Sequence, residues 1–73
     1  MLTAAEQIRI LLIRKNMTLS ELADKIEISR QNLSNKMKRD NFAEKEMMEI
    51  AEALGCSLEI NFIDKKTGER LTK

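Results

Sequence analysis

Residues 17–39 read MTLSELADKIEISRQNLSNKMKR, and this segment is the most informative about the fold. Its first part predicts a short helix, because Thr18 is a suitable N-cap and Glu21 follows three residues later, as in a capping box. After a three-residue turn, Ser29 is the N-cap of a second helix over about residues 30–38. Two helices joined by a turn of this length are typical of a helix-turn-helix.

The residues at the crossing of these helices and in the turn between them fit that motif. Two helices approach closely where they cross only if a small residue stands there, and Ala23 is that residue. Ile28 in the turn and Leu33 in the second helix are apolar, as they must be to hold the crossing angle.

Helices are also predicted on both sides of the motif, over about residues 4–15 and 43–54. Thr3 and Glu6 form another capping-box pattern, and Gly55 stands where a left-handed residue ends a helix. In the first helix Ile10 and Ile13 widen the apolar face, so we expect that helix to be buried on more than one side.

The chain changes its pattern after residue 55. Residues 58–63 alternate with the two-residue period of a half-buried strand, and the turn-rich residues 64–68 lead into a short return strand at 69–72. The predicted fold is therefore mainly α, with four helices and a C-terminal β-strand or β-hairpin. Residues 1–55 form the helical domain and residues 56–73 a β extension.

Composition excludes several classes of protein. The 73 residues, 42% hydrophobic and 34% charged, suit one soluble globular domain, and no apolar run approaches the ~18 residues of a membrane span. We therefore expect a cytoplasmic protein with no membrane association. The chain has no His and no Gly-rich phosphate loop, and it is too short to enclose a substrate pocket, so we expect no enzyme, metal or cofactor. Cys56 alone forms no internal disulfide and is expected to be a buried structural thiol.

Charge is unevenly distributed, although the net charge is only +1. Residues 29–39 carry four cations and no acid, whereas residues 40–60 carry six acids and one cation. A positive and a negative face suit a protein that docks on phosphates with one side. Ordinary solvated charge remains an alternative for this feature alone.

Residues 17–34 resemble the Cro and phage-repressor (XRE-type) helix-turn-helix family, and the resemblance extends over about residues 4–55. Glu27 stands where the family usually has Gly, so either its backbone is left-handed without that help or the turn differs. Leu19 replaces a frequent Gln. Lys36 replaces an apolar residue whose role Met37 takes, which implies a local rotation or extension of the helix.

The resemblance implies that the second helix of the motif enters the major groove of DNA. By this resemblance Arg30, Gln31 and Asn35 match the family's base-reading positions, and Ser34 supports them. Arg grips guanine and Gln or Asn grips adenine through paired hydrogen bonds. The residues suited to phosphate contact are Thr18, Ser29, Lys36, Lys38 and Arg39. For Ser29 a capping role is an equal alternative.

Repressors of this type usually bind a pseudo-palindromic operator on double-stranded DNA as homodimers. The C-terminal strand offers an unpaired edge that two copies can join. The residues expected at this dimer interface are Leu58, Ile60, Phe62 and Ile63. A hairpin that only caps its own core is the alternative.

Two functions therefore stay open. The first is a sequence-specific transcriptional regulator. The second is an antitoxin or other protein-interaction module on the same scaffold, suggested by the acidic fourth helix and the apolar strand, and the two overlap because antitoxins often bind DNA.

Overall fold

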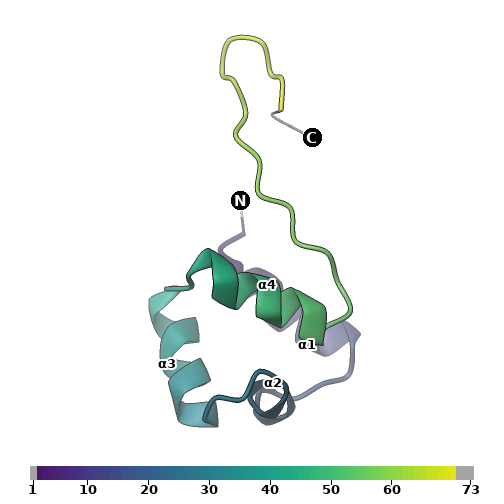
Figure 1. Cartoon of the computed structure of the whole chain (residues 1–73), viewed down its shortest axis with the longest axis vertical. Coiled ribbons are helices and arrows are strands. Elements are labelled where there is room, and N and C mark those ends of the chain that lie inside the picture. Colours follow the sequence, from purple (N-terminus) through teal and green to yellow (C-terminus); the bar gives the residue numbers. More distant parts are fainter. Residues whose placement is uncertain (1, 71–73) are drawn as a thin grey trace.

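The computed structural model describes residues 2–70. Within these residues the chain forms four helices, α1 (Ala4–Arg14), α2 (Leu19–Lys25), α3 (Arg30–Arg39) and α4 (Glu44–Ala53). The helices gather at one end of the molecule, and the segment after α4 extends away from them (Figure 1). The mainly α prediction is confirmed, and each helix begins and ends close to its predicted residues.

Local hydrogen bonds determine where the helices begin. Thr3 and Thr18 each form a complete capping box, and the Ser29 hydroxyl oxygen accepts a hydrogen bond from the backbone N–H of Asn32 at 3.0 Å. Helix α4 begins after Ala43, which has no capping side chain. There the Glu46 carboxylate alone provides half of a capping box, since it accepts from the Ala43 N–H at 2.9 Å.

The helices end at left-handed residues. These are Asn16, Glu27, Asp40 and Gly55, with φ between 51° and 69°. After α2, the Ile28 N–H donates to the Ala23 carbonyl at 3.0 Å and the Glu27 N–H to the Asp24 carbonyl at 3.2 Å. This pair of bonds is the Schellman motif, which satisfies carbonyls at the end of a helix. The turn of the helix-turn-helix therefore has its left-handed residue at Glu27 without glycine.

The core lies where the helices meet. Leu22 of α2 and Leu33 of α3 are fully buried, and Ala23 is almost so, as expected for the small residue at the crossing. Met37 of α3 is also buried, and it occupies the inner position that Lys36 does not. The other buried apolar residues are Ala5, Ile8, Leu12, Ile50, Ala51 and Leu54.

One packing prediction is wrong. Helix α1 is fully buried along one face; Ile10 outside that face is half-buried, but Ile13 is 80% exposed. The buried residues Ala5, Ile8 and Leu12 follow a spacing of three and four, which keeps them on one face of a helix. Ile13 lies about 100° around the helix from Leu12, beyond that face.

The predicted C-terminal strand is also wrong for the single chain. Among residues 2–70 no strand forms, and one isolated antiparallel bridge joins Ile63 to Arg70. The turn itself is confirmed: Gly68 has φ 75°, and the Asp64 N–H donates to the Glu69 carbonyl at 2.9 Å. A two-stranded ribbon on its own is marginal in water, and no third strand within the described part of the chain lies beside residues 58–62. Residues 71–73, which include the end of the predicted return strand, lie outside the described residues.

A membrane span is not among the described elements, since none of the helices within residues 2–70 combines the required length with the required hydropathy.

Candidate nucleic-acid interface

The outer face of α3 is polar along its length. Gln31, Asn35 and Lys38 are spaced four and three residues apart, so they share one face, and all three are exposed. The buried Leu33 and Met37 mark the opposite side and anchor the helix to the core. The sequence therefore places its hydrogen-bonding side chains on the surface of α3 and its apolar ones beneath.

Two side chains of this face contact each other. The Gln31 Nε2 donates to the Asn35 Oδ1 at 3.2 Å, one helical turn away. This bond holds two amides side by side. It leaves the Gln31 Oε1 as an acceptor and the Asn35 Nδ2 as a donor for another molecule.

The two other predicted base-reading residues differ in exposure. Arg30 is exposed at the first position of α3, next to the Ser29 cap. Ser34 is half-buried, because it lies on the flank of the helix between the outer face and the core. Arg30 is therefore better placed than Ser34 to reach another molecule.

Thr18 and Ser29 both use their hydroxyl oxygens as caps. At Thr18 the backbone N–H is also engaged, since it donates to the Glu21 Oε1 at 3.0 Å. This hydrogen bond lowers the pKa of Glu21 below its usual value, so its carboxylate is ionised at neutral pH. A negative charge already occupies the start of α2, which makes Thr18 a weaker phosphate site than the sequence suggested.

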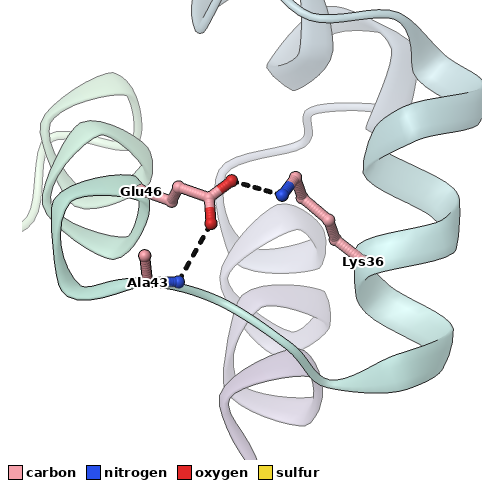
Figure 2. A network of polar contacts seen from close by, with 3 residues as sticks. All are labelled: Lys36, Ala43 and Glu46. Carbon is pink, nitrogen blue, oxygen red and sulfur yellow. Dashed lines mark hydrogen bonds and ion pairs between the residues drawn. The ribbon is translucent and has the colours of Figure 1, made fainter.

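Lys36 lies on the other flank of α3, where it forms an ion pair with Glu46 of α4 (Figure 2). The Nζ to Oε2 distance is 2.5 Å, and the side chains are 27% and 33% exposed. The hydrogen bond from Lys36, followed by that from the Ala43 N–H, lowers the pKa of Glu46. Lys36 is thus engaged within the protein, whereas Lys38 and Arg39 are exposed.

A shallow polar hollow of about 200 Å³ opens beside the second half of α3. The residues that line it are Asn32, Asn35, Lys36, Arg39 and Asn41. Asn41 was not among the residues predicted for this interface. The available signal was its position two residues after the basic end of α3.

The four predicted dimer residues are all exposed. Their exposed fractions are 38% for Leu58, 53% for Ile60, 79% for Phe62 and 56% for Ile63. Leu58 and Ile60 border an apolar groove of about 260 Å³ that is also lined by Ile8, Leu11 and Leu54. Phe62 does not line that groove, so the tail leaves most of its apolar surface open in one copy.

Cys56 borders the same groove and is half-buried, so the prediction of a buried thiol is only partly correct. Within residues 2–70, no three side chains of the metal-binding types come together in a group that could hold an ion.

Comparison with known protein families agrees with the helix-turn-helix formed by α2 and α3. A family model described as the bacteriophage CI repressor helix-turn-helix domain matches residues 9–63. The matched range begins inside α1, contains α2 to α4 and continues into the tail. No curated protein and no solved structure matches the chain.

Proposed function

The chain belongs to the bacteriophage CI repressor helix-turn-helix domain family, and we propose that it is a transcriptional regulator that inserts α3 into the major groove of DNA. The observation that carries this proposal is the outer face of α3, where exposed hydrogen-bonding side chains stand over the buried Leu33 and Met37. A rigid helix with such a face suits the width of the groove, which admits one α-helix.

The amide pair of α3 suits an adenine. Adenine presents a donor at N6 and an acceptor at N7 in the major groove. The acceptor left free on Gln31 and the donor left free on Asn35 are complementary to those two atoms. Arg30 offers the paired donors that suit guanine O6 and N7.

Phosphate contacts would hold this helix in register without reading sequence. Lys38 and Arg39 are the best placed for this role, because both are exposed at the end of α3. Asn41 is added to this group, since it lines the same hollow as Arg39. Ser29 remains a candidate at the start of α3, where a helix N-terminus favours an anion.

We also propose that the protein acts as a homodimer through its tail. The exposed apolar side chains within residues 58–63 support a homodimer, since a second copy would cover apolar surface that one copy leaves in water. Two tails related by a two-fold axis would present the same patch to each other, as an isologous interface requires. Within residues 2–70 the backbone of residues 58–62 makes no hydrogen bond to another backbone group, which supports its pairing with a second copy.

Selection of bound sequences from a random pool of DNA duplexes tests the proposal. A regulator that reads DNA with α3 as a dimer will enrich a pseudo-palindrome whose half-site centres lie about 10–10.5 base pairs apart, or a multiple of that spacing. Failure to enrich any sequence would contradict base reading. A single half-site without its mirror image would contradict the homodimer alone.

A further inference from the structure

We propose that Glu46 is a positioning residue that acts through Lys36: it holds the Lys36 ammonium on α4 and so withholds one cation from DNA phosphates. This inference rests on the proposed binding of DNA by α3. Its consequence is a lower sequence-independent affinity for DNA, because that component of binding comes from cations that neutralise phosphates.

The carboxylate of Glu46 is held at two points (Figure 2). One oxygen, Oε2, contacts the Lys36 Nζ, and the other, Oε1, accepts from the Ala43 N–H at 2.9 Å. The second bond belongs to the first turn of α4 and ties the carboxylate to the backbone. Glu46 therefore stays with α4, and Lys36 must break the ion pair before it reaches a phosphate.

Lys36 nevertheless lies within reach of the DNA-facing side of α3. It lines the polar hollow together with Asn35 and Arg39, and both of those residues are exposed. Glu46 is not among the residues that line the hollow, so a phosphate bound there would compete with Glu46 for the Lys36 ammonium. One ammonium thus stands between a fixed carboxylate in the protein and a phosphate on the DNA.

The strength of the ion pair suits competition. Partly exposed ion pairs contribute little to stability, so removing this pair by a change at Glu46 costs the fold little and leaves Lys36 available to a phosphate. Each cation that neutralises a phosphate adds about 0.9 to the slope of log affinity against log salt concentration. While Lys36 is paired with Glu46, the salt slope lacks this increment. When the pair is broken and Lys36 contacts a phosphate, the slope gains it.

The test compares salt slopes on a scrambled DNA duplex, measured by fluorescence anisotropy over a series of salt concentrations. The informative variant is Glu46→Gln, because a glutamine oxygen still accepts from the Ala43 N–H and preserves the start of α4. Glu52→Gln is the matched control, since it removes the same charge from an exposed position of the same helix. Thermal denaturation followed by circular dichroism checks that each variant is folded.

We expect Glu46→Gln to bind the scrambled duplex about two- to fivefold more tightly at low salt, with a slope steeper by up to about 0.9, while Glu52→Gln changes the slope much less. In the double variant Lys36→Met with Glu46→Gln the gain disappears. Lys36→Met alone leaves the slope near that of the wild type.

Three results would overturn the inference. The first is an equal effect of Glu46→Gln and Glu52→Gln, which indicates general repulsion of DNA. The second is a gain that persists when Lys36 is replaced. The third is a lower slope for Lys36→Met alone, which shows that Lys36 already contacts phosphate. These results leave DNA binding by the wild type intact, whereas a wild type that binds no duplex at low salt would remove both this inference and the proposed function.

Discussion

Glu27 holds a left-handed backbone conformation, with φ 60°, in the turn between α2 and α3. The two hydrogen bonds that close α2 require this conformation, so the helix crossing depends on it. Asn16 and Asp40 adopt similar angles, but their short polar side chains tolerate them better than a glutamate does. Glu27 is therefore a residue at which the chain retains backbone strain.

Replacing Glu27 with Gly should stabilise the protein. Relief of about 1–2 kcal/mol of left-handed strain outweighs the greater freedom of glycine in the unfolded chain, so we expect a net gain of about 0.5–1 kcal/mol in the free energy of unfolding. For a domain of this size that corresponds to a Tm several degrees higher. Glu27→Ala is the control, because alanine keeps the strain. Equal Tm values for the two variants would contradict the explanation.

Lys38 is the residue that best separates phosphate contact from base reading. It is exposed on the outer face of α3 and makes no ion pair within the described residues. We expect Lys38→Ala to weaken binding to all DNA sequences alike and to reduce the salt slope by about 0.9. Loss of affinity on one sequence only, seen in anisotropy titrations at several salt concentrations, would instead assign Lys38 to base reading.

At the scale of elements, Asp40 links the end of α3 to the start of α1. Its Oδ1 accepts a hydrogen bond from the Ala5 N–H at 2.8 Å in a partly buried position. A carboxylate there satisfies a free N–H in the first turn of α1 and complements the helix dipole. Helix α3 is thus fixed at its end by a contact to α1, the first helix of the chain.

Removal of that contact should destabilise the whole domain. We expect Asp40→Ala to lower the free energy of unfolding by about 1–2 kcal/mol, since it removes a cap and a residue suited to the left-handed angle. Asp40→Asn keeps both an acceptor and that conformational preference, so it should lose much less. Urea denaturation measures both variants, and equal losses would show that the negative charge, not the hydrogen bond, matters.

The helix ends could be predicted from the sequence, whereas the contacts between helices could not. Thr3, Thr18, Ser29 and Gly55 were identified correctly because each acts on residues three or four positions away. The contacts of Asp40 with Ala5 and of Lys36 with Glu46 were missed, because they depend on which helix faces meet. The period of residues 58–63 is that of a strand, but a strand also needs a partner, and among residues 2–70 the only pairing is the bridge between Ile63 and Arg70.

At the scale of the whole molecule, a helical body carries an extended apolar tail (Figure 1). Phe62 is 79% exposed, and a large aromatic side chain in water is costly to leave uncovered. The proposed homodimer covers this tail with its copy. The protein-interaction hypothesis covers it with a second small protein.

Phe62→Asp should convert the proposed dimer into monomers in sedimentation experiments, because a charge in the centre of an apolar interface is expensive to bury. Ile13→Asp is the matched control: Ile13 is equally exposed but lies on α1, so this variant should remain dimeric. A wild type that is monomeric at high micromolar concentration would remove the homodimer and favour a different partner for the tail.

Reading of DNA sequence by the outer face of α3 is the property on which the proposed function depends. The most direct measurement is titration of the wild type, Arg30→Ala and Gln31→Ala on a selected duplex and on its scrambled counterpart. We predict that each variant loses about 1–3 kcal/mol of binding free energy on the selected duplex. Gln31→Ala should keep wild-type affinity on the scrambled one, and Arg30→Ala should lose only what one positive charge contributes. Unchanged affinity on the selected duplex, or an equal loss on both duplexes, would contradict the claim.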